Sequence, residues 1–193
     1  MNWAGGDPLL STFIGYPEGE LARLIFHELA HQIAFAKGDT EFNESFATAV
    51  ERIGAQRWLA TQASPQARED YERFDNQRRD FRALTMRYRD RFEALYSGAG
   101  TEADKRAAKA ALMRELRADY ETLKRERWGG YSGYDGWFAR ANNAAFGVLA
   151  AYNGLAPHFE RLFEREGRDF HRFYTEVRRL AALPAAERRQ ALP

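Results

Sequence analysis

The stretch EGELARLIFHELAHQIA, which runs from Glu18 to Ala34, contains the pattern H-E-x-x-H at residues 27–31. Its apolar residues recur every three or four positions, and this period predicts an amphipathic helix. Residues four apart share one face of a helix, so the imidazoles of His27 and His31 can bind the same metal ion. Glu28 can reach a water molecule on that ion. The pattern therefore predicts a zinc site with a carboxylate base beside it.

The predicted metal helix has recognisable ends. Pro17 suits a first helical turn and Gly38 suits a helix end, so we expect the helix to extend over about residues 17–37. Its apolar stripe, which we expect to be the packed face, consists of Leu21, Leu24, Ile25, Leu29 and Ile33.

A zinc site of this kind needs a third protein ligand, and Glu44 is the nearest suitable candidate. The chain has no cysteine, and its other two histidines lie far downstream. A second helix is predicted over about residues 42–61, with Asp39 or Thr40 as its N-cap. The side of this helix that carries Glu44 has mostly small residues, which lets two helices approach closely. We therefore expect His27, His31 and Glu44 to bind one Zn2+ ion.

Three more side chains near Glu44 are candidates for hydrogen bonds to the ligand imidazoles, which normally have such partners. Glu51 lies two turns beyond Glu44 and suits a hydrogen-bonding or salt-bridging role better than direct ligation. Thr48 and Asn43 are the alternatives.

The segment NESFA at residues 43–47, followed by Glu51, resembles the Asn-Glu-x-Phe-Ala-x-x-x-Glu segment of gluzincins of the aminopeptidase N type. Thermolysin-like enzymes also have an Asn-Glu pair at this point. Only 12 residues separate His31 from Glu44, fewer than in either family. The chain is more similar to a bacterial family of predicted zinc aminopeptidases, many of them described as lipoproteins. The matching segments are DPLLST at 7–12, ELARLIFHELAHQ at 20–32, KGDTEFNESFA at 37–47, Asn142-Asn143-Ala, and Tyr152 to Phe159.

This resemblance covers about residues 7–183 and implies a zincin-like core, one zinc ion and aminopeptidase activity on a peptide substrate. It also implies that Tyr152 lies on one helix with residues 142–143 and is the first candidate to stabilise the oxyanion. His158, Tyr134 and His171 follow. Members of the family usually have a longer N-terminal part with an export and lipidation signal, which implies a periplasmic or membrane-anchored location. No such signal is present in this chain, which we expect to be the metal-site domain alone or a truncated relative.

The expected chemistry is hydrolysis by water on zinc. Three ligands leave one position open, and zinc lowers the pKa of a water there towards ~7. Glu28 would take the proton as the water attacks a peptide carbonyl, and would pass it to the leaving amine. An aminopeptidase also needs an acid for the substrate's α-ammonium group. The Gly-x-Met-Glu-Asn element of aminopeptidase N is absent, so Glu51 and Asp135 are the candidates within this chain.

The composition argues against several other functions. The 29 basic residues are balanced by 28 acidic residues, giving a net charge of +1, so nucleic acid is not the expected partner. No stretch is apolar enough to span a membrane. A length of 193 residues favours one domain, which we expect over residues 1–193.

The rest of the chain is also predicted to be helical, so the expected fold class is mainly α. We expect a zincin-like metallopeptidase core with a long antiparallel helical hairpin insertion. The metal-site helices would occupy about residues 17–61, the hairpin about 64–127 and the C-terminal helices about 137–182. The last region is expected to contain helices over 138–152, 157–165 and 169–180. Segment 128–137, rich in glycine and aromatic residues, either lines a substrate site or packs its aromatics on the core.

Three functions are consistent with these patterns. The first is a zinc peptidase, most simply an aminopeptidase, with a non-peptide amide substrate as a variant. The second is a zinc-binding but catalytically inactive helical protein that docks partners, but a purely structural site has no need of Glu28. The third is a helical scaffold without metal, and the position of Glu44 argues against it.

Overall fold

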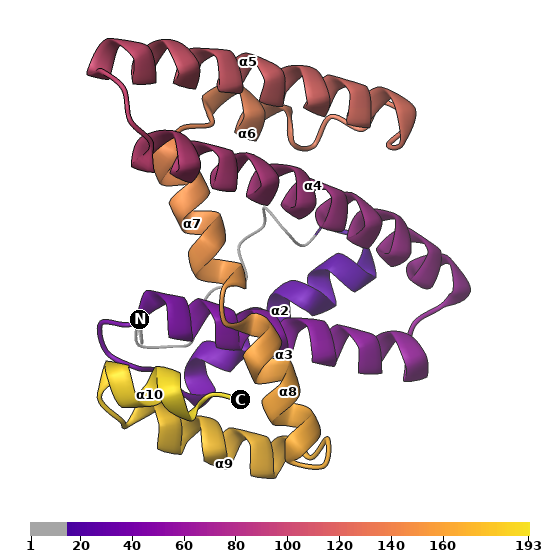
Figure 1. Ribbon diagram of the computed structural model, residues 1–193. Helices are drawn as coiled ribbons and strands as arrows, with labels where there is room; N and C mark the ends of the chain where they lie inside the picture. Colours follow the sequence, from indigo (N-terminus) through magenta and orange to yellow (C-terminus); the bar gives the residue numbers. More distant parts are fainter. Residues whose placement is uncertain (1–14) are drawn as a thin grey trace. The chain divides into compact units, whose positions relative to one another are not determined.

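The computed structural model describes residues 15–193, and every regular element in this part of the chain is a helix (Figure 1). The predicted mainly α class is therefore confirmed. The matching segment at residues 7–12 lies outside the described residues. None of the described helices is both long and apolar enough to cross a membrane.

The chain forms two compact units. The first comprises the described residues up to Arg73 together with Ala151–Pro193, and the second comprises Phe74–Ala150. Two helices, α4 (Pro65–Ser97) and α7 (Asn143–Asn153), contribute residues to both units. The expectation of one domain over residues 1–193 stays a prediction.

The first unit is built around two helices that pack closely, α2 (Glu18–Ile33) and α3 (Thr40–Thr61) (Figure 1). Asp39 is the N-cap of α3, and its Oδ1 accepts a hydrogen bond from the Phe42 amide at 3.0 Å, as predicted. Gly54 on α3 lets the helices approach, because a Cβ there would lie 2.8 Å from the Phe26 ring of α2.

The end of α2 differs from the prediction. The helix stops at Ile33, and Ala34 is extended, with φ −149°. The cause is Asn43, whose side-chain amide accepts a hydrogen bond from the Ala36 amide at 2.8 Å and donates one to the Ala36 carbonyl at 2.9 Å. Both polar groups of Ala36 are thus used outside a helix.

The packed face of α2 also differs from the predicted apolar stripe. The buried residues of α2 are Gly19, His27 and Ala30, whereas Leu29 is 50% exposed. Phe26 packs on Gly54 of α3, whereas a Cβ at Gly19 would meet the Tyr71 ring of α4 at 2.9 Å. The other residues of the predicted stripe are partly buried, and Ile33 packs against the core of the first unit.

Three C-terminal helices complete the first unit: α8 (Ala156–Arg165), α9 (Phe170–Ala181) and α10 (Ala185–Ala191). Aromatic rings from α3, α8 and α9 form the centre of its core, with Phe42 and Phe159 at 5.0 Å and Phe46 and Phe173 at 5.9 Å between centroids. Helix α10 lies beyond the predicted C-terminal region, because seven residues are too short to show a clear apolar period.

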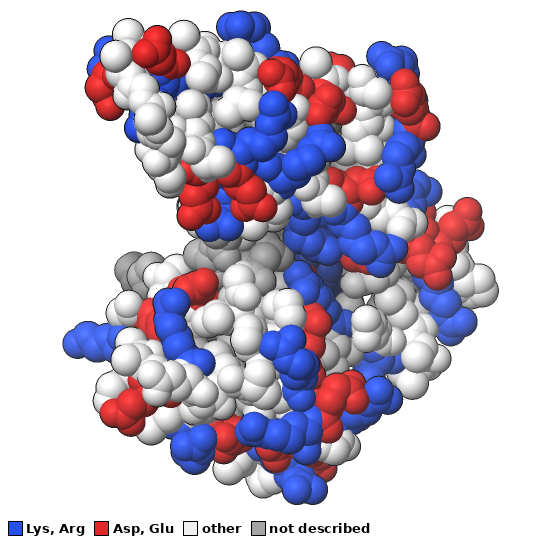
Figure 2. Space-filling model, in the orientation of Figure 1, with Lys and Arg blue, Asp and Glu red and all other residues white. Residues whose placement is uncertain are grey.

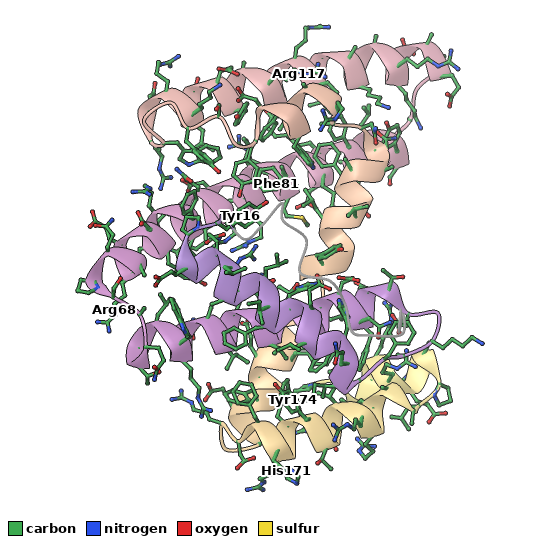
Figure 3. The ribbon with its side chains drawn as sticks, turned by 180° about the vertical axis from the view of Figure 1, so that it is seen from behind. Tyr16, Arg68, Phe81, Arg117, His171 and Tyr174 are labelled. Carbon is green, nitrogen blue, oxygen red and sulfur yellow. The ribbon has the colours of Figure 1, made fainter. Side chains whose placement is uncertain are left out.

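The second unit contains most of α4, α5 (Glu102–Glu126), α6 (Asp135–Arg140) and the first part of α7. The ion pairs Arg87–Asp119 and Arg91–Glu115 show that α4 and α5 run antiparallel. Thr101 and Asp104 form a capping box at the start of α5. The buried Phe81 is in the core of this unit (Figure 3).

Two further segments of the second unit can be compared with the sequence predictions for residues 128–137 and 138–152. In segment 128–137, Trp128 is buried and donates to Asp80 at 3.0 Å, and Tyr134 stacks on Phe81 at 4.3 Å, so these aromatics pack on the core. The helix expected over 138–152 is interrupted, because α6 ends at Arg140 and α7 begins at Asn143. Asn142 accepts a hydrogen bond from the Ala145 amide at 3.1 Å, which is a typical N-terminal cap.

On the face shown in Figure 2, Lys and Arg side chains are interspersed with Asp and Glu side chains. This mixture agrees with the near-neutral net charge of the sequence.

Candidate metal centre

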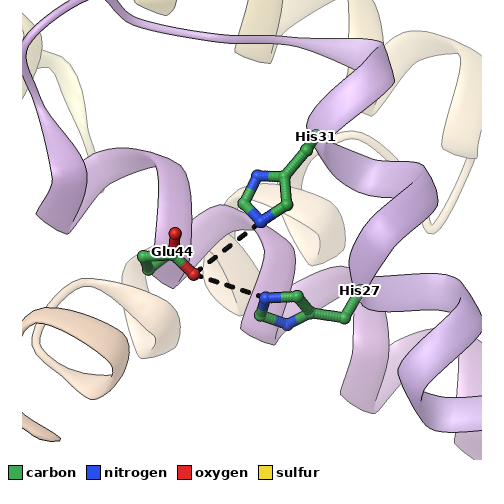
Figure 4. A group of neighbouring side chains, drawn as sticks. All are labelled: His27, His31 and Glu44. Atoms are coloured by element: carbon green, nitrogen blue, oxygen red, sulfur yellow. Dashed lines mark ion pairs between the residues drawn. The ribbon is translucent and has the colours of Figure 1, made fainter. Parts of the chain in front are cut away.

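His27, His31 and Glu44 converge between α2 and α3 (Figure 4). The Glu44 Oε2 atom lies 3.3 Å from Nε2 of His27 and 3.7 Å from Nε2 of His31. One ligand atom from each of the three residues can be chosen so that all lie within 4.8 Å of one another. Spacing along the two helices, joined by the short segment 34–39, thus brings together the three predicted ligands.

The donor set fits a zinc ion on two grounds. Two ligands each ~2.1 Å from a tetrahedral zinc ion lie about 3.4 Å apart, close to the separations between Glu44 and the two histidines. In addition, Glu44 Oε2 is buried and has no hydrogen-bond partner among the described residues. A buried carboxylate oxygen without a donor is costly, and a cation between it and the imidazoles would compensate it.

Glu51 holds the other side of the His27 ring. Its Oε2 atom lies 3.0 Å from His27 Nδ1, and its Oε1 accepts a short hydrogen bond from Arg23. A proton on Nδ1 that is donated to Glu51 leaves Nε2 with a free lone pair directed towards Glu44. Of the candidates for a hydrogen bond to a ligand imidazole, Glu51 therefore contacts His27, whereas Asn43 is engaged with Ala36.

Arg23 was not among the sequence candidates. It lies one turn before His27 on α2, so a four-residue spacing was the signal that could have found it. Its partner Glu51 is 28 residues away, a pairing that only the packing of α2 on α3 creates.

The two imidazoles have opposite pKa shifts. Burial lowers the pKa of His27, but the hydrogen bond and charge of Glu51, with Glu44 and Glu28, outweigh burial and raise it. Burial lowers the pKa of His31, and its neighbour His27 adds to this effect against the charge of Glu44. His31 is thus the imidazole that stays neutral more readily in the metal-free protein.

Glu28 and Tyr152 lie beside this cluster. The charge of Glu28 contributes to the pKa of both histidines and of Tyr152, and its side chain is exposed. The Tyr152 ring stacks on His27 with 6.1 Å between centroids and is 38% exposed. Burial raises the pKa of the Tyr152 phenol, and the charge and hydrogen bond of Glu44 raise it further. The hydroxyl is therefore protonated at neutral pH and can donate its proton in the hydrogen bond to Glu44.

The lower-ranked oxyanion candidates have other surroundings. His158 contacts the Pro193 carbonyl through Nδ1, and His171 is exposed and points outward from α9 (Figure 3). Tyr134 belongs to the core of the second unit. Asp135, a candidate acid for an α-ammonium group, is paired with Lys124 at 2.8 Å in that unit.

Two ring nitrogens and one carboxylate oxygen are a combination of donors that could hold a metal ion. The chain matches the model of the family described as "Putative aminopeptidase" over residues 1–192, and it belongs to that family. No curated protein and no solved structure shows significant similarity to it. The family membership supports the sequence-based expectation of a peptidase.

Proposed function

We propose that this chain is a zinc-dependent peptidase that acts as an aminopeptidase, with a zincin-like core formed by α2 and α3 and the α4–α5 pair as a helical insertion. The observation that carries the proposal is the buried Glu44 Oε2, which faces both histidine Nε2 atoms and lacks a hydrogen-bond donor among the described residues. Membership of the aminopeptidase family supports the choice of substrate class.

His27, His31 and Glu44 would hold the ion. A bound zinc ion lowers the pKa of water and polarises a carbonyl group. The contribution of Glu51 is to accept the Nδ1 proton of His27, which keeps the lone pair on Nε2. Arg23 donates to the second oxygen of Glu51 and so fixes the direction of the carboxylate.

Glu28 is the proposed general base. It follows His27 directly on α2, is exposed, and acts electrostatically on both histidines. Its carboxylate would accept a proton from the attacking water and return that proton to the leaving amine.

Tyr152 is the proposed electrophile. The phenol is neutral because its pKa is raised, its ring is stacked on that of His27, and its hydroxyl is hydrogen-bonded to Glu44. Its hydroxyl would donate a hydrogen bond to the oxygen of the substrate carbonyl as negative charge develops there.

The proposal is tested by metal analysis of the purified protein together with assays on aminoacyl and N-acetylated aminoacyl substrates. We expect about one zinc per chain and hydrolysis of the unblocked substrates only. Glu28→Gln should retain zinc and lose about 100- to 10,000-fold in kcat, the usual worth of a general base. Glu18→Gln is the matched control, since Glu18 is an exposed carboxylate on the same helix.

The outcomes separate the competing functions. Equal activity of wild type and Glu28→Gln would refute the mechanism. Hydrolysis of the blocked substrates would exclude an aminopeptidase and favour an amidase or endopeptidase. Bound zinc with no activity on any substrate would support the inactive, partner-docking alternative. No bound zinc, with a melting temperature unchanged by His31→Ala, would support a metal-free scaffold.

A further inference from the structure

Arg188 on α10 is the most deeply buried arginine of the described chain and is remote in sequence from every proposed ligand. Its side chain is 6% exposed and that of its partner Asp39 is 8% exposed. The guanidinium donates to Asp39 Oδ2 and to the carbonyls of Leu180, Ala181 and Leu183. It also lies over the Phe42 ring at 5.0 Å from the centroid. The guanidinium of Arg188 therefore joins the carbonyls at the end of α9 to Asp39, at the start of α3.

The start of α3 determines where Glu44 lies. Asp39 uses one oxygen for Arg188 and the other as the N-cap for the Phe42 amide. One turn later, Asn43 holds the Ala36 backbone through two hydrogen bonds, which fixes the connection back to α2. Glu44 is the next residue, so a shift of Asp39 would move the carboxylate relative to the imidazoles of α2.

A second arginine of the C-terminal helices acts on the other end of the same connection. Arg178 on α9 donates to the Ile33 carbonyl at 3.0 Å, at the last residue of α2. The segment between His31 and Glu44 is thus held at both ends by α9 and α10. A covalent link of only 12 residues would otherwise leave the separation of the two ligands variable.

We propose that Arg188 is a positioning residue for the metal centre, which acts through Asp39 to set the separation of Glu44 from His27 and His31. This inference rests on the zinc site of the proposed function. Ligands held in the geometry of the bound state need no ordering when the ion arrives, so loss of this clamp weakens binding without removing a ligand.

The test is the Zn2+ dissociation constant of the double variant Asp39→Asn/Arg188→Met, measured by competition with a chelator. The pair of changes removes the buried ion pair without leaving one unpaired charge, and Asn keeps the N-cap acceptor. We expect zinc binding to weaken about tenfold at a temperature where circular dichroism shows the variant fully folded. The single variant Arg188→Lys keeps the positive charge beside Asp39 but loses the planar guanidinium group. Its zinc affinity should therefore lie between that of the double variant and that of wild type.

The chain provides a matched control in the neighbouring pair Arg189–Glu41. This pair joins the same two helices at 2.6 Å, but the Arg189 side chain is 52% exposed. Glu41→Gln/Arg189→Gln should change the zinc dissociation constant by less than about twofold. A merely structural role for Arg188 would lower the melting temperature and leave the affinity of the folded state unchanged.

A readout without zinc keeps the proposal testable if the double variant unfolds. In metal-free Arg188→Lys, the Ala36 amide, which is bonded to Asn43, should exchange its hydrogen faster than in wild type. Wild-type zinc affinity in the folded double variant, or unchanged exchange at Ala36 in Arg188→Lys, would overturn the proposal. These measurements use no peptide. A wild type that binds zinc but hydrolyses nothing would refute the proposed function and leave the expected affinity ratio standing.

Discussion

At the scale of single residues, the candidate site contains a series of contacts that connects an arginine, a carboxylate and a proposed ligand. Arg23 contacts Glu51, Glu51 contacts His27, and His27 faces Glu44. Opposite charges alternate along this line, which allows the two carboxylates to be buried near each other. The arrangement makes the protonation of His27 depend strongly on Glu51.

The pKa shifts give a prediction for the metal-free protein. Histidine titration by NMR should place the pKa of His27 above 6.5 and that of His31 below it. The contribution of His27 to stability is then fully present below pH 6.5 and is lost as the pH rises through its raised pKa. The contribution of His31 has the opposite sign, because protonation below pH 6.5 favours the unfolded chain.

The variant Glu51→Gln tests whether Glu51 is the cause of the raised pKa of His27. Burial alone lowers the pKa of His27, so loss of the Glu51 charge should bring that pKa down, while the pKa of His31, on which Glu51 acts only through His27, should change less. Glu18→Gln serves as the control. An unchanged His27 titration in Glu51→Gln would show that Glu51 does not hold the imidazole in solution.

The residues of the site were predictable to the extent that helical spacing determines them. His27 and His31 lie four apart, and Glu51 lies seven beyond Glu44, so each pair shares a helix face whatever the tertiary structure. Arg188 and Asp39 are 149 residues apart, and no local pattern relates them. The contact of Asn43 with Ala36 was likewise not predictable from the sequence, because it depends on how the segment 34–39 between α2 and α3 folds back.

At the scale of elements, the approach of α2 to α3 depends on small residues. A Cβ at Gly54 would meet the Phe26 ring at 2.8 Å, whereas a Cβ at Gly147 on α7 would meet nothing within 4 Å. Both glycines are helical, so the same substitution at the two positions separates packing from helix propensity.

Gly54→Ala should destabilise the protein although alanine is the better helix former. Overpacking costs about 1–3 kcal/mol and the gain in propensity is about 1 kcal/mol, so we expect a net loss of roughly 1 kcal/mol. Gly147→Ala should raise the free energy of unfolding by about 0.5–1 kcal/mol, since nothing opposes the gain. Denaturant titration measures both. A stabilising Gly54→Ala would mean that α2 and α3 are not in this close contact.

Helix positions were largely predictable from caps and apolar period, as Asp39 and the capping box at Thr101 and Asp104 show. The orientation of α2 was not predictable from these signals. Its apolar stripe suggested a packed face of large residues, but the closest approaches of α2 are Gly19 to Tyr71 and Phe26 to Gly54. The break before Asn143 was missed because the apolar residues on both sides continue a helical period.

At the scale of the whole molecule, the proposed metal site lies entirely within the first compact unit, as do Tyr152 and Arg188. The second unit has its own core around Phe81, Tyr88 and Tyr120. Zinc binding should therefore stabilise the first unit directly.

Hydrogen exchange with and without a chelator tests this expectation. At a free zinc concentration 100 times its dissociation constant, binding contributes about 2.7 kcal/mol, which corresponds to roughly 100-fold slower exchange where opening releases the ion. We expect this slowing at amides of α2 and α3 and little change in α5. Equal slowing in α5 would show that the two units open together, and no slowing in α2 would argue against the site.

The connection between α2 and α3 also has a consequence for the order of folding. The three proposed ligands lie within residues 27–44, so their helices pair with little loop-closure entropy and can meet while the chain is being synthesised. Arg188 leaves the ribosome long after them and closes a loop of 149 residues. The nascent site would thus capture its ion loosely, and the arrival of α10 would slow the release of that ion.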